Sequence, residues 1–326
     1  MPEIDVEAGI AGLRPGARTL GAPTGQWVGI AANAGSGRGA GRRSVERLSD
    51  LLERDGISAR VGWTPDQRAE LVARAERDDS CRCLVAAGGD GTVAALINDR
   101  PGVPIAVLPA GTENLFARHY RIDRRPDRVA RSIIDGRVAP LDLGLAGDRR
   151  FALMAGIGFD ADVVTRHHRA RTALTGIVRP TNRAAYVEPV LRSSLTYRFP
   201  PLTIRIDEPG REETIVGTTA FLFNLPRYAL GLPFAPEAKA DDGLLDLVVF
   251  RDAGAFRALH YLWLVLRGLH LRRDDVYHRL VRKVTVSSPV PVPIQLDGDP
   301  GGHLPDDAVS GLTFEAIAGA VEVIQP

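Results

Sequence analysis

The sequence is poor in lysine and cysteine, and each shortage excludes a class of site. Lys239 and Lys283 are the only lysines among 41 basic residues. Because a Walker-type phosphate loop needs a lysine after its glycines, no glycine-rich stretch here can be one. Cys81 and Cys83 are the only cysteines. We expect no disulfide between them, and without a histidine pair at ligand spacing they do not predict a zinc site.

The sequence also lacks strong net charge and long apolar runs. The formal net charge is +1, so there is no basic field of the kind that nucleic-acid-binding proteins show, and we expect no nucleic-acid partner. The first 26 residues are rich in Gly, Ala, Pro and charge and contain no secretory apolar core. With no disulfide framework either, these features favour a cytoplasmic protein.

Two kinds of pattern follow one another along the chain. Up to about residue 139, apolar strands alternate with helices, which predicts a doubly wound parallel sheet. After residue 140 the apolar runs are mostly short and predict antiparallel strands. The expected strands are 27–32, 57–63, 83–87 and 103–108 in the first part, then 202–206, 215–223, 244–250, 281–286 and 292–296, with a final apolar pattern at 314–324. Thr64-Pro65-Asp66-Gln67 predicts a helix start with a capping box, and 126–136 predicts a further helix.

Residues 84–98 contain the turn around which the first part is organised. An apolar strand ends at Gly88-Gly89-Asp90-Gly91, and a helix-like segment starts at Thr92. Glycines let main-chain N–H groups approach an anion, and a helix N-terminus adds a favourable dipole, although a plain strand-to-helix turn uses the same glycines. The carboxylate of Asp90 would repel a phosphate unless a cation lies between them. This turn therefore predicts a metal-bound nucleotide.

Five motifs in order carry a family resemblance. Residues 88–92 resemble the Gly-Gly-Asp-Gly-Thr signature shared by diacylglycerol kinases, sphingosine kinases and, more distantly, NAD kinases and phosphofructokinases. Residues 33–37 resemble the family's N-P-x-S-G, and 109–114 resemble its P-x-G-T-x-N. Residues 241–246 and 297–299 resemble its D-D-G-x-L-D and D-G-E elements. The match spans about residues 27 to 326.

The resemblance implies a fold of two domains. We expect an N-terminal tail (1–26), an α/β ATP-binding domain (27–139), a β-sandwich lipid-substrate domain (140–304) and a C-terminal segment (305–326) that returns to the first domain. In such open sheets ligands lie at the carboxyl ends of strands, where the turns at 33, 64, 88 and 111 all fall. The nucleotide site is predicted to comprise Asn33, Gly35, Ser36, Gly37, Arg38, Thr64, Gly88, Gly89, Asp90, Gly91, Thr92, Gly111, Thr112, Glu113 and Asn114.

The later motifs imply a metal site and a base. In the bacterial lipid kinases that the chain resembles, the D-D-G loop binds a structural Mg²⁺, and the corresponding ligands are Lys239, Asp242 and Leu244. Oxygen ligands of this kind suit a hard cation. The glutamate of D-G-E takes the proton of the lipid hydroxyl, and Asp299 stands in its place, with Asp297 as the alternative and Asp90 linked to catalysis through the metal.

Three departures from the family pattern bear on these assignments. Ala34 replaces a proline, Leu115 replaces an aspartate, and Asp299 is one methylene shorter than the family's glutamate. Each motif also has a simpler interpretation. Residues 35–40 match a G-x-G-x-x-A dinucleotide pattern but lack the acid expected at the end of the next strand. Thr112 or Asn114 could cap a helix, 241–243 could be a solvent loop, and 297–298 a hairpin turn.

A helix is predicted around Leu259, Leu262, Trp263, Leu266 and Leu269, which recur on one face. The segment is too short to span a bilayer, and we expect a buried helix, with a membrane-surface helix as the alternative.

These patterns predict an ATP-dependent kinase that phosphorylates a membrane lipid, diacylglycerol above all, with ATP as co-substrate and Mg²⁺. A sphingoid or polyprenol kinase, or a catalytically silent nucleotide-binding protein, would use the same scaffold. The expected partners are the lipid and, transiently, the inner face of the membrane; a homodimer is compatible with the sequence.

Overall fold

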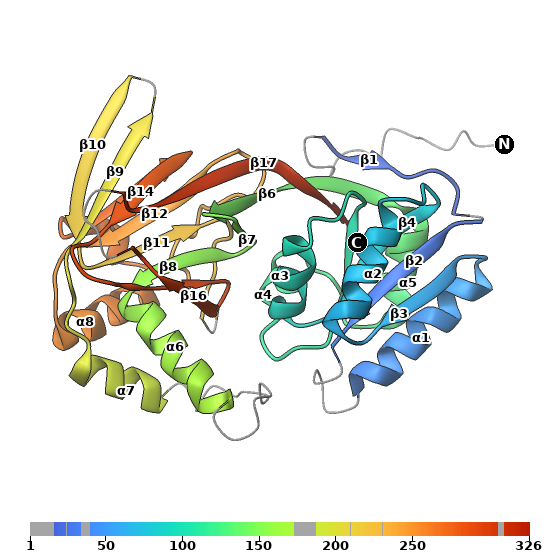
Figure 1. The fold of residues 1–326 in the computed structure, drawn as a ribbon, viewed down its shortest axis with the longest axis horizontal. Coiled ribbons are helices and arrows are strands. Elements are labelled where there is room, and N and C mark those ends of the chain that lie inside the picture. The colour runs from blue at the N-terminus through green and yellow to red at the C-terminus, as the bar shows by residue number, and fades with distance from the viewer. Residues whose placement is uncertain are drawn as a thin grey trace.

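Two halves lie side by side in the computed structural model (Figure 1). The structure describes residues 16–23, 25–33, 40–172, 187–208, 210–229, 231–305 and 310–326. The first half holds helices α1 to α5 around a parallel sheet, and the second is built mainly of antiparallel strands with helices α6 to α8. No helix within these ranges is both long enough and apolar enough to cross a membrane.

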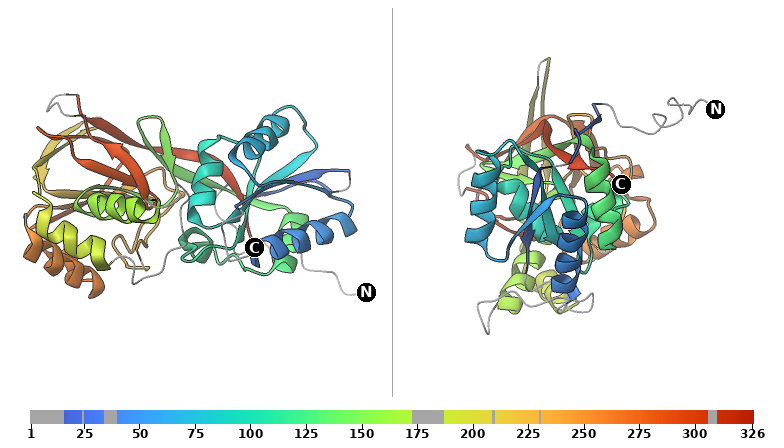
Figure 2. Two further views of the ribbon diagram at one scale, coloured as in Figure 1. Left: turned by 60° about the horizontal axis from the view of Figure 1, so that its bottom comes forward. Right: turned by 90° about the vertical axis from the view of Figure 1, so that its right-hand side faces the viewer.

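The parallel sheet has helices on both faces (Figure 2). Its strands run in the order β3-β2-β4-β5, and all three neighbouring pairs are parallel. Alternate residues of β4 and β5 enter two separate cores, one with α2, α3 and α4 and the other with α1 and α5. The predicted doubly wound α/β domain is confirmed. The strands are β1 (Arg18–Thr19), β2 (Trp27–Ala32), β3 (Ser58–Gly62), β4 (Cys81–Gly88) and β5 (Ile105–Pro109); the helices are α1 (Ala40–Arg54), α2 (Pro65–Ala75), α3 (Asp90–Asn98), α4 (Leu115–His119) and α5 (Pro126–Asp135).

Capping residues define the ends of two of these helices. Thr64 caps α2, with its hydroxyl accepting from the N–H of Gln67 at 3.2 Å, while the Gln67 side chain accepts from the N–H of Trp63 at 2.7 Å. The first of these bonds is that of the predicted capping box, whereas the Gln67 side chain binds the N–H of the residue before the N-cap rather than that of Thr64. Helix α5 ends at Gly136, whose φ of 65° lies in the left-handed region that glycine adopts without strain. Both cysteines are free and buried, so the expectation of no disulfide is confirmed.

The second half is a sandwich of two antiparallel sheets. One sheet has the order β13-β12-β11-β8-β15-β16, and the other contains β10-β9-β14-β17 with β6 and β7. Alternate residues of β11 and β12 point into the core between the sheets, and the rest pack under α8. The predicted β-sandwich is confirmed. The strands are β6 (Arg137–Ala146), β7 (Arg149–Phe151), β8 (Met154–Gly158), β9 (Leu202–Glu208), β10 (Arg211–Gly217), β11 (Thr219–Phe223), β12 (Leu245–Phe250), β13 (Val276–Val281), β14 (Lys283–Ser287), β15 (Pro293–Leu296), β16 (Asp299–His303) and β17 (Leu312–Ile324); the helices are α6 (Phe159–Thr172), α7 (Val187–Thr196), α8 (Ala255–Leu266) and a 3₁₀ turn, η4 (His270–Arg272).

Two long strands join the halves. β6 and β17 pair along most of their length, and Val323 of β17 also lies beside Ile105 of β5 in parallel register. The second sheet of the sandwich is therefore continuous with the parallel sheet (Figure 1). The domain boundary predicted near residue 140 lies inside β6.

Three predictions for the second half need correction. Residues 215–223 form parts of two strands, because the chain passes from one sheet of the sandwich to the other at Thr218. Residues 281–286 divide in the same way at Arg282. Helix α8 is present, but Leu259, Leu262, Trp263 and Leu266 of the face predicted to be buried are exposed, and Tyr261, Leu264 and Val265 face the core instead. Leu269 lies beyond the end of the helix and is half-buried against the core.

Candidate active site

The glycine turn lies between the end of β4 and the start of α3. Gly88 ends the strand and Gly89 is the N-cap of the helix. A Cβ on Gly88 would lie 2.1 Å from the hydroxyl of Thr92, so no other residue fits there. The first turn of α3 lies at this edge of the sheet, where a helix N-terminus favours an anion.

A second glycine loop packs directly on the first. A Cβ on Gly111 would lie 2.5 Å from the Cα of Gly89, so the two loops touch backbone to backbone. Asn114 holds this loop in shape, because its side chain accepts from the N–H of Gly111 at 3.0 Å and donates to the Gly111 carbonyl at 2.8 Å. Asn114 is itself buried and has a left-handed φ of 48°. The side-chain amide of Asn114 therefore fixes the conformation of the loop. Of its neighbours, Thr112 is exposed and Glu113 is half-buried.

Asp90 ties the glycine turn to α4. Its two carboxylate oxygens accept from the N–H groups of Leu115 and Phe116, each at 3.0 Å. Asp90 therefore caps a helix 25 residues further along the chain, at the point where Leu115 replaces the family's aspartate. Burial raises the pKa of Asp90, and the two hydrogen bonds oppose that rise.

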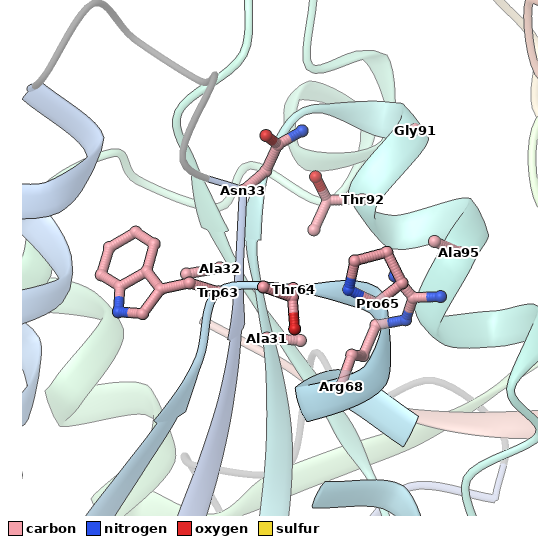
Figure 3. Close-up of a pocket in the computed structure, with 10 residues that line it drawn as sticks. All are labelled: Ala31, Ala32, Asn33, Trp63, Thr64, Pro65, Arg68, Gly91, Thr92 and Ala95. Carbon is pink, nitrogen blue, oxygen red and sulfur yellow. The ribbon is translucent and has the colours of Figure 1, made fainter. Parts of the chain in front are cut away.

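A pocket of about 200 Å³ opens beside this turn (Figure 3). Ala31, Ala32 and Asn33 at the end of β2 form one wall, and Gly91, Thr92 and Ala95 of α3 form another. The remaining wall comes from the start of α2, with Trp63, Thr64, Pro65 and Arg68. Asn33, Thr64, Gly91 and Thr92 are thus brought together as predicted strand-end neighbours. Gly35, Ser36, Gly37 and Arg38 lie outside the described residues.

Arg68 is a pocket residue that the sequence did not single out. Its guanidinium forms an ion pair with Asp99, the residue that follows α3. The ion pair joins α2 to the end of α3. It keeps the positively charged guanidinium of Arg68 at the pocket wall. Its sequence signal, one arginine in an arginine-rich helix, is too common to be noticed.

Asp297 and Asp299 lie at the hairpin between β15 and β16 and have different surroundings. Asp297 and Gly298 have φ values of 54° and 87°, as a two-residue type I′ turn requires. The carboxylate of Asp297 accepts three main-chain N–H bonds, from Ala152 at 2.8 Å, Leu153 at 2.7 Å and Met154 at 3.1 Å. Burial nevertheless raises its pKa to about 6.

Asp299 faces the other half of the molecule. One of its carboxylate oxygens lies 3.5 Å from the position that a Cβ on Gly91 would take. It is half-buried, and no hydrogen bond or ion pair engages its carboxylate among the described residues. The aspartate is thus directed at the start of α3, across the junction between the two halves.

A half-buried aspartate behind this hairpin is a second residue that sequence reasoning missed. Asp160 of α6 accepts from the side chain of Gln295 at 3.0 Å, and the oxygen of Gln295 accepts from the N–H of Gly298 at 2.8 Å. Asp160 is therefore linked to the turn that carries Asp299. Burial raises its pKa to about 6. A polar residue directly after the apolar strand β8 was the available signal.

The predicted magnesium loop is held by a buried carboxylate. Asp142 of β6 accepts from the N–H of Gly243 at 2.6 Å, and Asp242 accepts from the N–H of Leu244 at 3.0 Å. Partial burial raises the pKa of Asp242, and repulsion from Asp142, Asp246 and Asp241 adds to the rise. A cation would relieve that repulsion. Lys239 is exposed beside the loop.

No group of three or more His, Cys, Asp or Glu side chains is placed to bind a metal in the described ranges. A cation at the 241–243 loop would therefore need main-chain oxygens beside Asp242, such as the carbonyls of Lys239 and Leu244.

Comparison with known proteins matches both halves. The model of the diacylglycerol kinase catalytic domain matches residues 28–146, and that of the YegS C-terminal NAD kinase beta sandwich-like domain matches residues 154–325. A diacylglycerol kinase of Mycobacterium tuberculosis (strain ATCC 25618 / H37Rv) is 28% identical over 302 residues, covering 89% of this chain and 92% of that protein. A diacylglycerol kinase of Bacillus subtilis (strain 168) is 27% identical over 237 residues, covering 70% and 74%.

A solved structure shares the fold. The crystal structure of a diacylglycerol kinase from Bacillus anthracis str. Sterne superposes with a TM-score of 0.64 at 17% identity, covering 92% of this chain and 97% of that one. The second family model alone spans more than half of the sequence. With both halves matched in order, the chain belongs to the diacylglycerol kinase family and is a lipid kinase.

Proposed function

We propose that this lipid kinase transfers the terminal phosphate of ATP to the hydroxyl of diacylglycerol. The observation that carries the proposal is the position of Asp299 in the β half, opposite Gly91 at the start of α3. An acceptor and a phosphate donor held by the two halves would meet between these residues. Diacylglycerol is proposed as the acceptor because the relatives that match most of the chain are diacylglycerol kinases.

ATP is proposed to bind along the carboxyl edge of the parallel sheet. The pocket of about 200 Å³ is smaller than most ligand pockets and suits one part of a nucleotide, such as the base. The N–H groups at the start of α3 and the loop at Gly111 then suit the phosphates. A Cβ on Gly88 or Gly111 would lie 2.1 or 2.5 Å from a neighbouring atom, so these loops can pack this closely only as glycines.

Asp299 is the proposed general base. It would accept the proton of the lipid hydroxyl while that oxygen forms a bond to the γ-phosphorus, and the bond to the β–γ bridging oxygen would break to release ADP. Asp297 is less suited to this role, because its oxygens already accept three main-chain N–H bonds. Gln295, which donates to Asp160 and accepts from the N–H of Gly298, would position Asp299 without contact to the lipid.

Mg²⁺ is proposed at the loop of residues 241–243. Asp242 would supply a carboxylate, and the carbonyls of Lys239 and Leu244 would supply further oxygen ligands. When bound there, the ion would supply structural stabilisation of the loop. Asp90, whose oxygens cap α4, is proposed to fix the glycine turn rather than to bind a metal directly.

The test is phosphate transfer from ATP to a lipid panel of diacylglycerol, a sphingoid base and a polyprenol, with wild type, Asp299→Asn and Asp299→Glu. We expect transfer to diacylglycerol, a rate about 10² to 10⁴ times lower for Asp299→Asn with little change in ATP affinity, and a rate at or above wild type for Asp299→Glu. Transfer only to another lipid would replace the substrate. An Asp299→Asn enzyme with near-normal turnover would remove Asp299 from the mechanism.

A further inference from the structure

Helix α8 exposes an apolar face to solvent. Phe256, Leu259, Leu262, Trp263 and Leu266 have exposed fractions of 90%, 47%, 37%, 49% and 60%. At 100° per residue these five side chains fall within one arc of about 120°, opposite the buried Tyr261, Leu264 and Val265. Single exposed apolar residues are ordinary, but a contiguous exposed arc of this kind marks an interaction surface.

Helix α7, beside α8, also exposes apolar side chains. It contacts α8, and both lie on the same side of the sandwich (Figures 1 and 2). Leu191 and Leu195 are one helical turn apart, with exposed fractions of 59% and 85%. We call the exposed apolar side chains of the two helices the α7–α8 face: Leu191, Leu195, Phe256, Leu259, Leu262, Trp263 and Leu266.

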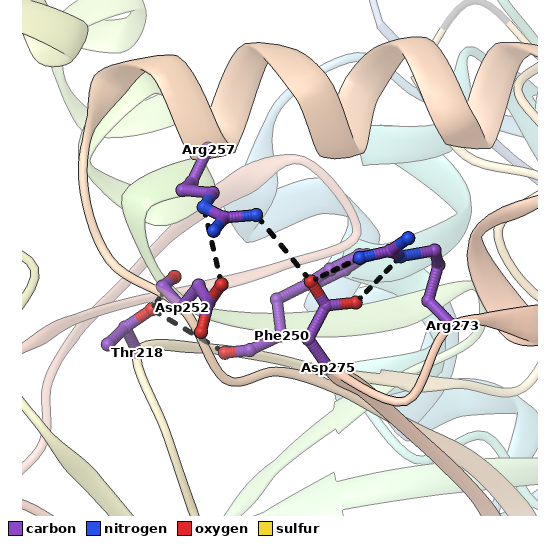
Figure 4. A network of polar contacts seen from close by, with 6 residues as sticks. All are labelled: Thr218, Phe250, Asp252, Arg257, Arg273 and Asp275. Atoms are coloured by element: carbon purple, nitrogen blue, oxygen red, sulfur yellow. Dashed lines mark hydrogen bonds and ion pairs between the residues drawn. The ribbon is translucent and has the colours of Figure 1, made fainter.

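A polar network fixes which side of α8 is outward (Figure 4). Arg257 forms ion pairs with Asp252 at 3.3 Å and Asp275 at 3.8 Å, and Asp275 also pairs with Arg273 at 3.0 Å. The hydroxyl of Thr218, just before β11, donates to the carbonyl of Asp252 at 2.7 Å. These contacts anchor the first turn of α8 to the sheet beneath it. The apolar arc is thus held outward rather than left free to rotate inward.

From the start of α8 to Arg273 the charged side chains are all arginines, whereas on α7 Glu188 pairs with Arg192 at 3.5 Å. No acidic residue occurs between Asp252 and Asp274, while Arg257, Arg267, Arg272 and Arg273 lie in that interval. Arg267 stacks on the ring of Trp263 at 5.6 Å from its centroid, next to the apolar arc. Arg251, Arg267 and Arg272 are exposed and form no ion pair within the described ranges. A Trp, Leu and Phe surface with an arginine rim is the composition of helices that lie in a membrane interface.

The charge also decides between a bilayer and a second copy of the chain. A two-fold dimer brings the same patch of both copies together, so the arginine rims would face each other and repel. An anionic lipid surface attracts them instead. This choice rests on the proposed function too, since a lipid acceptor must be taken from a bilayer.

We propose that the α7–α8 face docks the enzyme on an anionic membrane surface. The apolar side chains would enter the boundary between headgroups and acyl chains while Arg251, Arg267 and Arg272 contact lipid phosphates. The docking surface lies on the half that carries Asp299, so the half proposed to present the acceptor is the one held at the membrane.

The test is flotation with vesicles of phosphatidylcholine alone and of phosphatidylcholine with a quarter phosphatidylglycerol. We expect wild type to float with the anionic vesicles, and Leu259→Ser combined with Leu266→Ser to lower the partition coefficient about tenfold or more, because two apolar side chains are lost from the interface. Val61→Ser is the matched control, since Val61 is 37% exposed on β3 in the α/β half of the molecule and should float like wild type.

Trp263 supplies a direct probe. Trp27 is 4% exposed and Trp63 is partly buried, so a blue shift and quenching by brominated lipid should come from Trp263. In Trp263→Phe the fluorescence change should disappear while flotation remains. Equal flotation of wild type and the Leu259→Ser, Leu266→Ser double variant would overturn the proposal. So would a wild-type dimer that this double variant dissociates, because a second copy would then cover the face.

Kinase assays separate this proposal from the proposed function. With a short-chain, dispersed diacylglycerol the double variant should turn over like wild type, and with long-chain diacylglycerol in anionic vesicles it should be about tenfold slower. If no lipid is phosphorylated but the double variant still loses flotation, the proposed substrate fails and the docking surface stands. Normal turnover on both substrates by the double variant would contradict the docking surface alone.

Discussion

Asp297 and Asp299 are two residues apart, yet only one has a carboxylate that a substrate could reach. The three N–H groups that Asp297 accepts belong to residues 152–154, so it fastens the hairpin to the start of β8. In Asp297→Asn the new amide would place a donor against one of those donors. We expect a loss of about 1–3 kcal/mol in the free energy of unfolding, measured by urea denaturation.

Asp299→Asn is the control for that experiment and should leave the free energy of unfolding nearly unchanged while lowering the rate. If Asp297→Asn were as stable as wild type yet inactive, with Asp299→Asn active, Asp297 would be the base and our assignment would be wrong.

Asp90 also has a structural task that its motif does not reveal. Asp90→Asn would leave one N–H of Leu115 or Phe116 facing an amide donor. We expect a loss of about 1–3 kcal/mol in unfolding free energy together with a loss of kinase activity, because the glycine turn and α4 would separate. Full stability with no activity would favour a direct role of the carboxylate at the nucleotide; unchanged activity would remove Asp90 from the mechanism.

Asp160 predicts a pH dependence of stability. Its pKa in the folded chain is about 6, above the ordinary value of 3.8, so the folded state holds a proton that the unfolded state has released. This contribution to stability is fully present below pH 3.8 and is lost as pH rises through about 6. Between pH 4 and pH 7, the free energy of unfolding of wild type should fall by about 1–3 kcal/mol relative to that of Asp160→Asn. Parallel urea-denaturation curves across that range would contradict the burial of a neutral Asp160.

At the scale of elements, the two glycine loops depend on each other. Gly111→Ala would put a methyl group 2.5 Å from the Cα of Gly89 and 2.8 Å from the side-chain oxygen of Asn114. Forcing the loops apart should lower the free energy of unfolding by about 1–3 kcal/mol. The rate of phosphate transfer should fall about 10²-fold, because the phosphates of ATP would be misplaced. Gly102→Ala is the matched control, since nothing lies within 4 Å of its Cβ position. Equal rates for the two variants would show that the close approach is unimportant.

The elements of the α/β half could be predicted because their signals are local. Strand ends, capping residues and glycines lie within a few positions of one another, as at Thr64 and Gly88. The corners of the sandwich could not, because a single residue, Thr218 or Arg282, separates the two strands at each change of sheet, which leaves no loop to be recognised. Helix α8 is apolar around most of its circumference, so periodicity alone could not say which face meets the core.

The same distinction holds for the site. The glycine turns carry a signature in consecutive residues. The link from Asp160 to Gln295 joins residues 135 apart, and Asp90 reaches an amide 25 positions away. These contacts exist only once the fold brings distant segments together, and no spacing in the sequence encodes them.

At the scale of the whole molecule, the two halves are joined by β6 and β17, and a carboxylate lies at that joint. Asp142 of β6 accepts from Gly319, in the bulge of β17, at 2.8 Å and from Gly243, in the proposed magnesium loop, at 2.6 Å. The buried side chain thus connects the inter-half strands to a loop of the sandwich.

At this joint, substitutions of Asp142 and Asp242 should change stability in different ways. In Asp142→Asn the new amide group would place a donor against the N–H of Gly243 or Gly319. The free energy of unfolding should therefore fall by about 1–3 kcal/mol, with or without Mg²⁺. Asp242→Ala removes one hydrogen bond on an exposed loop, from the N–H of Leu244, so without Mg²⁺ its melting temperature should be close to that of wild type, whereas the rise that Mg²⁺ produces in wild type should vanish. Melting curves of the three proteins in EDTA and in Mg²⁺ would show both effects. If wild type does not respond to Mg²⁺, residues 241–243 form only a loop, and Asp142 alone holds it, because its hydrogen bonds to Gly243 and Gly319 need no ion.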